Sequence, residues 1–285
     1  MKINHKKILT LRGKTIGVVY TSMYETVAQM ILQYYDTEEF YNTLFVVNCL
    51  TYEDSNDIDF RSYCRNWSKY IYYQLNNLYI FPEYVANEHM SQFDEIWDSS
   101  KFNMNYYPED VKDKVWYMPL RYVNIPKIQP KEEYKYDIGF IGTLTPFRQD
   151  MLSRITKYWT DDYCRVKTIS GVPYSQLYDE IADCKYLIDL PRSASYGSIL
   201  NNVRIFETLC SGKQIIAETF GDVENPFTWL IKGYTGIYTI YNIVKEDPAD
   251  NSEVFKQWTD TDEKYENYRK YFFGEEDYKP RLSLK

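Results

Sequence analysis

The stretch DIGFIGTLTPFRQ, residues 137–149, joins an apolar run to a segment with helical spacing. Asp137 to Ile141 predicts a buried strand, and Phe147 to Tyr158 predicts the helix that follows it. Small residues between them, Gly142 and Thr143, let backbone N–H groups approach a ligand, and the helix N-terminus favours a diphosphate there. Arg148 would add a bidentate contact to that group, although an ordinary turn followed by a surface arginine has the same sequence.

The same alternation of apolar run and helical segment extends in both directions. It predicts strands at residues 15–20, 44–48, 70–73, 95–97, 115–118, 164–169, 186–190 and 214–217, and helices at 24–35, 174–183 and 199–210. Repeated strand–helix units indicate parallel sheets covered on both faces. Residues 123–135 hold two prolines and a run of charge, which is typical of a linker. We therefore expect an α/β chain with domains at residues 1–126 and 127–248, and a helical tail, 249–285, that packs back on the first domain.

Composition excludes several classes of protein. The 285 residues carry a net charge of −8, which does not favour non-specific binding of nucleic acid. With a mean hydropathy of −0.54 and no apolar run near ~18 residues, we expect no membrane insertion. Five cysteines without a CxxC pair indicate reduced thiols, a cytoplasmic location and no zinc site. GxGxxG and P-loop motifs are missing from the sequence, which disfavours dehydrogenases and kinases.

A second informative stretch is VRIFETLCSG, residues 203–212. Arg204 and Glu207 are three residues apart on one face of the predicted helix, where an intrahelical ion pair is the simplest interpretation. Together with the Gly142 turn, they suit a sugar nucleotide, because Arg204 would contact the diphosphate and Glu207 would accept from the ribose hydroxyls. Arg192, just after the predicted strand 186–190, would join them or remain an exposed loop residue.

The two stretches in this order resemble the donor domain of GT-B glycosyltransferases, and Phe93–Asn103 with Val115–Leu120 resembles the end of the acceptor domain. This resemblance implies two Rossmann-like domains with parallel sheets facing a cleft. Within the class, the chain is similar to phage DNA β-glucosyltransferases. That similarity implies that Val172, in the GVP segment 171–173, lies where backbone groups contact uracil, and that Arg148, Arg204 and Glu207 bind the nucleotide.

The same resemblance raises a question about the catalytic base. Counting residues places Asn77, or its neighbour Asn76, where those enzymes have a catalytic aspartate, and an asparagine cannot act as a general base. Other candidates are Glu25 at the start of the first helix, Glu83, Glu88 and Asp94, each of which would otherwise be a solvated surface acid.

The resemblance thus implies a glycosyltransferase that uses a nucleotide sugar, with a UDP-linked donor and no protein-bound metal. A hydroxymethylated base in phage DNA is one acceptor it implies, which would place the enzyme in the host cytoplasm. A surface glycan or lipid-linked acceptor is the alternative, and an inactive sugar-nucleotide-binding protein is the third. A DNA acceptor requires a basic surface, for which the candidates are Lys69, Lys101, Lys112, Lys114, Arg121, Arg148 and Arg154.

Overall fold

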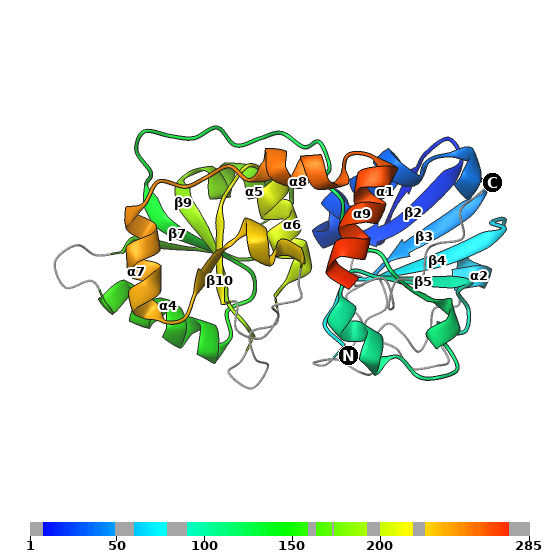
Figure 1. Ribbon diagram of the computed structural model, residues 1–285, viewed down its shortest axis with the longest axis horizontal. Coiled ribbons are helices and arrows are strands. Elements are labelled where there is room, and N and C mark those ends of the chain that lie inside the picture. Colours follow the sequence, from blue (N-terminus) through cyan, green and yellow to red (C-terminus); the bar gives the residue numbers. More distant parts are fainter. Residues whose placement is uncertain are drawn as a thin grey trace. The chain divides into compact units, whose positions relative to one another are not determined.

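The computed structural model describes residues 8–48, 60–78, 90–158, 164–172, 174–192, 200–218 and 226–273 (Figure 1). The chain divides into two compact units. Unit 1 runs to Val123 and includes the chain again from Glu266, whereas unit 2 is Asn124–Tyr265. Each unit is a Rossmann-like α/β fold built on its own mostly or wholly parallel sheet, which confirms the predicted fold class.

The sheet of unit 1 has six strands in the order of the sequence. They are β1 (Ile8–Arg12), β2 (Ile16–Thr21), β3 (Thr43–Val47), β4 (Lys69–Gln74), β5 (Glu95–Asp98) and β6 (Val115–Tyr117). Strands β2 to β6 are parallel, as predicted, while β1 pairs antiparallel with β2. Strand β1 was not expected from the sequence, because its apolar residues follow a run of basic ones and are interrupted by Thr10.

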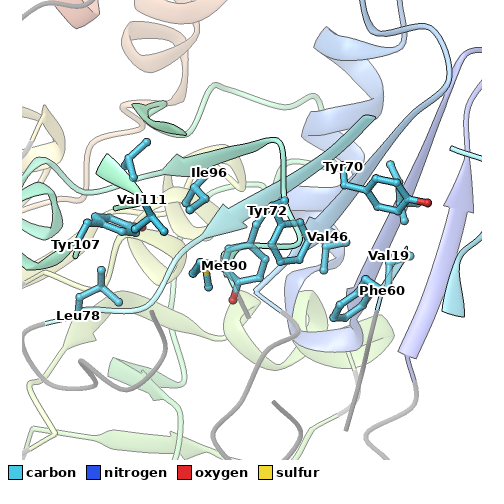
Figure 2. Close-up of a cluster of buried hydrophobic side chains, with 13 residues drawn as sticks. Val19, Val46, Phe60, Tyr70, Tyr72, Leu78, Met90, Ile96, Tyr107 and Val111 are labelled. Carbon is cyan, nitrogen blue, oxygen red and sulfur yellow. The ribbon is translucent and has the colours of Figure 1, made fainter. Parts of the chain in front are cut away.

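Both faces of this sheet are buried. On one face, Tyr35 at the end of α1 (Glu25–Tyr35) makes edge-on or tilted ring contacts with Phe40, Phe45 and Trp97. The opposite face carries the cluster drawn in Figure 2, in which Val19, Val46, Tyr72 and Ile96 come from four adjacent strands. Phe60 of the short α2 (Phe60–Tyr63) packs on that same cluster. Alternate residues of each strand therefore serve separate cores, as expected for a sheet covered on both faces.

The sheet of unit 2 is wholly parallel, with the order β11-β10-β9-β7-β8. Its strands are β7 (Tyr136–Ile141), β8 (Val166–Ile169), β9 (Cys184–Asp189), β10 (Ile215–Glu218) and β11 (Lys232–Tyr234). Because β8 lies on one side of β7 and β9 on the other, the direction of winding reverses between β7 and β9. In doubly wound sheets, ligands bind beside the carboxyl ends of the strands at this switch point.

Helices cover both faces of the unit 2 sheet. These are α4 (Pro146–Tyr158), α5 (Tyr174–Ala182), α6 (Asn202–Cys210), α7 (Ile237–Lys245) and α8 (Ser252–Thr259). On one face, Leu152 and Ile155 of α4 share a core with Ile240 of α7 and with Phe140 of β7. The helix α7 and the strand β11 were not predicted, and both follow residues 219–225, which lie outside the described part of the chain.

The C-terminal tail differs from the single helical segment expected over residues 249–285. It contains two helices, α8 and α9 (Asp262–Phe273), and α8 belongs to unit 2. Apolar packing holds α8 in unit 2, because Phe255 of α8 is fully buried and contacts the rings of Phe206 and Phe227. The predicted boundary at 248/249 is therefore wrong, and the division falls inside α9, after Tyr265.

Candidate functional site

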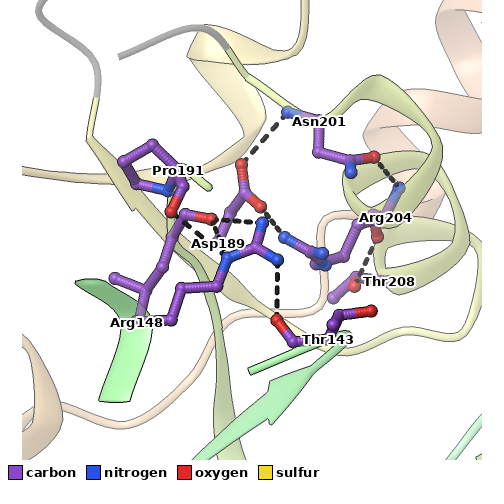
Figure 3. A network of polar contacts seen from close by, with 8 residues as sticks. Thr143, Arg148, Asp189, Pro191, Asn201, Arg204 and Thr208 are labelled. Atoms are coloured by element: carbon purple, nitrogen blue, oxygen red, sulfur yellow. Dashed lines mark hydrogen bonds and ion pairs between the residues drawn. The ribbon is translucent and has the colours of Figure 1, made fainter. Parts of the chain in front are cut away.

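The switch point of unit 2 brings together the residues that the sequence analysis assigned to a diphosphate. Gly142 and Thr143 follow β7, and Asp189 ends β9, which is the neighbouring strand. Arg148 lies on α4, which precedes β9 in the chain, and Arg204 lies on α6, which follows β9. Both side chains extend to the same point (Figure 3). Both guanidinium groups lie against the ring of Phe140, 5.2 and 5.3 Å from its centroid.

Arg148 is 8% exposed, and backbone carbonyl groups hold its guanidinium. Its Nη1 donates to Thr143 O at 2.9 Å, its Nη2 to Leu190 O at 2.9 Å, and its Nε to Leu190 O at 3.1 Å and Pro191 O at 3.2 Å. Burial, followed by the nearby charge of Arg204, lowers the pKa of Arg148 to about 10. Arg148 is therefore a fixed positive charge that ties the turn after β7 to the loop after β9.

Arg204 is held by a carboxylate instead. Its Nη1 forms an ion pair with Asp189 Oδ1, and the two side chains are only 10% and 6% exposed. The other oxygen of Asp189 accepts from Asn201 N at 3.1 Å, and the Asn201 side chain caps α6 by accepting from Arg204 N at 3.0 Å. Among the described residues, Asp189 pairs with Arg204 only, and Arg148 is held by carbonyl groups, so the three groups together carry a net charge of +1.

The backbone at Gly142 is specific to glycine. Its φ is +134°, and a Cβ placed there would lie 2.9 Å from Nη2 of Arg204. The Gly142 amide donates to Ile169 O at 3.0 Å, which ties this turn to the end of β8. The absence of a side chain at Gly142 therefore gives the Arg204 guanidinium room to lie close to the main chain of this turn.

The other residues predicted to bind the nucleotide sugar lie around Arg148 and Arg204, and they differ in how exposed they are. Thr145 accepts from Arg148 N at 3.3 Å as the N-cap of α4, and its hydroxyl donates to Arg192 O at 2.8 Å. The Arg192 side chain is exposed, but its charge is close enough to contribute to the lowered pKa of Arg148. Val172 is half-buried in the segment after β8, and Glu207 is half-buried one turn beyond Arg204 on α6. A direct role for any of these residues in nucleotide binding stays a prediction.

The carboxylate candidates of unit 1 are not brought together. Glu25 begins α1 directly after the carboxyl end of β2, and Asn77 follows the carboxyl end of β4. Asp94 lies at the opposite edge, before β5, where it forms a 2.7 Å ion pair with Arg61 and accepts from Tyr70 N at 2.8 Å. Glu83 and Glu88 lie outside the described residues. Asp94 thus has a structural explanation, and Glu25 and Asn77 lie at the edge where ligands bind in such folds.

Sequence reasoning missed two buried carboxyl groups. Asp189 was read only as part of a strand, and Asp98 only as part of a segment with a family resemblance. Asp98 is fully buried, and it accepts from Tyr107 Oη at 2.6 Å, Ser100 N at 2.7 Å and Asn103 Nδ2 at 3.0 Å. Burial, which those hydrogen bonds only partly offset, raises its pKa to about 7. An acidic residue at the end of an otherwise apolar strand was the signal in both cases.

The basic residues proposed for a DNA surface are largely engaged within their own units. None of the seven is without a partner, and six of the contacts are defined: Lys69 with Glu95, Lys112 with Glu109, Arg154 with Asp150, Lys114 with Phe93 O, Arg121 over the Tyr34 ring, and Arg148 as described above. Arg121 is also only 2% exposed. Paired or buried charges add little to the field that attracts a polyanion.

Three further observations delimit the site. No group of three or more His, Cys, Asp or Glu side chains that could hold a metal occurs in the part of the chain that the structure describes. A cavity of about 470 Å³ in unit 2 is lined by residues such as Tyr134, Arg165 and Lys185, and the switch-point residues are not among its lining. Within the described ranges, no helix has both the length and the apolar character needed to cross a bilayer.

Comparisons with known proteins give only distant likenesses. No protein-family model and no curated protein matches the chain. Two similar solved structures are a Glycosylation Associate Protein (Gap123) complex from Streptococcus agalactiae and accessory secretory protein 1, 2 and 3 in Streptococcus pneumoniae. Both have 11% identity and a TM-score of 0.37, covering 81% and 89% of this chain. The chain covers 50% and 54% of theirs, so it spans about half the length of these proteins. At this level neither likeness decides function, and neither protein is a phage DNA glucosyltransferase.

Proposed function

We propose that the chain is a glycosyltransferase that uses a nucleotide sugar and binds the diphosphate of a UDP-linked donor at the switch point of unit 2. One observation carries this proposal: the guanidinium groups of Arg148 and Arg204, both largely buried, face a glycine turn there, and only Arg204 is paired with a carboxylate. A net positive, largely dehydrated site beside main-chain amides suits a phosphate ester better than a neutral ligand.

The chemistry follows from where charge develops. When the bond between sugar and diphosphate breaks, negative charge accumulates on the leaving diphosphate. Arg148 is already fixed by three carbonyl groups, so it stabilises that charge without reorganising. Arg204 is one turn from Glu207 on α6, which would accept hydrogen bonds from the ribose hydroxyls.

For the acceptor, we favour a carbohydrate over hydroxymethylated DNA. The support is the pairing of Lys69, Lys112 and Arg154 with acidic neighbours, and the burial of Arg121. DNA binding depends on basic groups that replace counterions along the phosphate backbone. A glycan needs no such surface.

Calorimetric titration with UDP tests the donor site. Losing a hydrogen bond to a charged group typically costs about 1.5–3 kcal/mol, so Arg204→Ala should weaken UDP binding roughly 10- to 150-fold. Arg165→Ala is the matched control, because this arginine is exposed and pairs with Asp137 in the same unit. Unchanged UDP affinity in both Arg148→Ala and Arg204→Ala would refute the assignment.

Turnover separates the remaining alternatives. The purified chain is incubated with UDP- and GDP-sugars, and with hydroxymethylated DNA, plain DNA or an oligosaccharide panel. Transfer to oligosaccharides supports the proposal, and salt-sensitive transfer to hydroxymethylated DNA would replace the carbohydrate acceptor. UDP binding with neither hydrolysis nor transfer would indicate a binding protein without catalysis, the alternative that Asn77 motivates.

A further inference from the structure

The first strand of unit 1 lies at an edge of its sheet. β1 ends the six-stranded sheet, and among the described residues β2 is the one strand that pairs with it. Every residue of β1 has a partner in β2, and no bulge interrupts the register. The other side of β1 therefore presents a regular row of backbone N–H and C=O groups to a further strand.

The turn between β1 and β2 decides which backbone groups point outward. Gly13 N donates to Ile16 O at 3.0 Å, so these two residues form a hydrogen-bonded pair in the register of the two strands. Hydrogen-bonded pairs alternate along an antiparallel ladder, so Leu11 and Leu9 also direct their backbone groups toward β2. The backbone groups that point away from the sheet are consequently those of Ile8, Thr10 and Arg12.

The side chains of β1 differ between the two faces of the sheet. Leu9 and Leu11 lie on one face and are half-buried, whereas Thr10 and Arg12 lie on the other face and are exposed. A strand added to this edge would therefore place every second side chain beside a leucine and the intervening ones beside Thr10 and Arg12. The edge thus suits a partner strand in which apolar and polar residues alternate.

The charge at this end of the chain is opposite to that of the whole. The net charge is −8, yet residues 1–24 contain no Asp or Glu, and their basic residues are Lys2, Lys6, Lys7, Arg12 and Lys14. Arg12 and Lys14 are exposed, and within the described part of the chain neither forms an ion pair; Arg12 lies 6.0 Å from the centre of the Trp67 ring.

One acid, Asp36, is hydrogen-bonded to the turn after β1. Its oxygens accept from Lys14 N and Thr15 N, each at 2.7 Å, and from Thr15 Oγ1 at 2.8 Å, so its charge is engaged within the turn. The exposed cations are therefore available to a partner. Opposite charges on adjacent strands favour pairing and like charges oppose it, so an acidic strand fits this edge better than a second copy of β1 does.

We propose that β1 is a docking edge for an extended acidic segment of a partner protein, in which acidic and apolar residues alternate. The segment adds a strand to the sheet through the outward backbone groups of Ile8, Thr10 and Arg12. Its acidic side chains lie beside Thr10 and Arg12, and its apolar side chains lie beside the two leucines. This interaction belongs to unit 1 and does not rest on the proposed nucleotide-sugar site.

Fluorescence anisotropy with the full chain and a labelled, end-capped peptide, EVEVEVE, tests the edge. Two N-methylated forms separate strand pairing from charge attraction, because methylation of the glutamate amides removes the N–H groups that face β1, whereas methylation of the valine amides removes those that face away. We expect saturable binding of EVEVEVE and of the valine-methylated form, and at least tenfold weaker binding of the glutamate-methylated form and of KVKVKVK. No saturable binding of EVEVEVE, or equal binding of the two methylated forms, would overturn the proposal.

Two variants of the chain test the same edge from the other side. Thr10→Pro removes an outward N–H and no hydrogen bond to β2, and proline is tolerated on edge strands, so the unfolding midpoint should stay near that of the unmodified chain while EVEVEVE binds at least tenfold more weakly. Leu11→Pro is the contrasting variant, because its N–H faces β2, and it should lower the midpoint.

Charge reversal gives a readout that needs no change in the backbone. Arg12→Glu should weaken EVEVEVE and strengthen KVKVKVK, whereas Arg154→Glu, the control at an exposed arginine of unit 2, should change neither. EVEVEVE binding that Thr10→Pro leaves unchanged in a folded chain, or that Arg12→Glu lowers no more than Arg154→Glu does, would refute the assignment. UDP titration of the same samples addresses unit 2 alone, so its outcome leaves this proposal unaffected.

Discussion

Replacing Arg204 by methionine tests whether the Arg204–Asp189 pair is as isolated from solvent as its surroundings indicate. The two side chains are 10% and 6% exposed, and among the described residues the substitution leaves Asp189 with Asn201 N as its one remaining hydrogen-bond donor. Breaking a buried pair by removing one partner typically costs about 3–5 kcal/mol, because the remaining charge is uncompensated. For a unit of this size that corresponds to a fall in Tm of about 6–20 °C.

Arg165→Met is the matched control in the same unit. The Arg165–Asp137 pair is similar in chemistry, with a 2.9 Å contact, but its side chains are 55% and 20% exposed. Exposed pairs contribute about 0–1 kcal/mol, so the control should shift Tm by only a few degrees. Scanning calorimetry of the unit 2 transition measures both variants.

The double variant Arg204→Met/Asp189→Asn distinguishes lost charge balance from lost packing. Asparagine still accepts from Asn201 N but leaves no unpaired buried carboxylate, so we expect it to recover most of the lost Tm. If Arg204→Met shifts Tm no more than Arg165→Met, or if the double variant recovers nothing, the reasoning about this pair is wrong.

Two further predictions concern single positions. Gly142→Ala should lower Tm more than Gly171→Ala. Both glycines have a positive φ, but a Cβ at Gly142 would lie 2.9 Å from Arg204, whereas nothing in the described part of the chain lies within 4 Å of a Cβ at Gly171. Equal shifts in a thermal melt would contradict this prediction. Asp98 has a folded pKa of about 7, raised by burial from 3.8, so the folded state binds its proton more tightly than the unfolded chain does. The free energy of unfolding should therefore fall by about 3 kcal/mol as pH rises from 4 to 7. Urea titrations should show that Asp98→Asn flattens this dependence, and an unchanged slope would argue against it.

Sequence reasoning succeeded where one local signal decides the outcome. The run from Asp137 to Ile141 is continuous and apolar, so its strand could be predicted, and the helix after it begins at a Thr-Pro cap signal. Gly142, Arg148 and Arg204 lie close together because their two motifs follow adjacent parallel strands, and their role in nucleotide binding stays a prediction. Local sequence signals could not predict which side chains pair with each other, as in the contact between Asp189 and Arg204, which are fifteen residues apart.

The polar residues at the carboxyl ends of the unit 1 strands show the same difficulty in another form. Thr21, Gln74 and Asp98 end three strands and Asn48 directly follows a fourth, and only the register of the sheet aligns them. No spacing in the sequence marks such a set. Likewise, α8 is helical as expected, but the contacts of Phe255 with Phe206 and Phe227 decide to which unit it belongs.

The turn after β4 bears on the question of the catalytic base. Asn103 donates to Asn76 O at 2.8 Å and accepts from Leu78 N at 2.9 Å, and it also donates to Asp98. The buried Asp98 thus holds, through Asn103, the turn that contains Asn77. Its own acceptor positions are filled, so Asp98 positions this turn and is not placed to take a proton from a substrate.

Among the described candidates, this leaves Glu25 as the carboxylate best placed for proton transfer. It is half-buried at the start of α1, at the carboxyl edge of the sheet, and close enough to Tyr20 for its charge to help raise the pKa of that phenol. Asp94 is tied to Arg61 at the opposite edge. We expect Glu25→Gln to lower the rate of sugar transfer by about 10²–10⁴-fold, the usual contribution of a general base, with UDP affinity unchanged. Asp94→Asn is the control and should retain transfer. A Glu25→Gln variant with an undiminished rate would place the base outside the described residues.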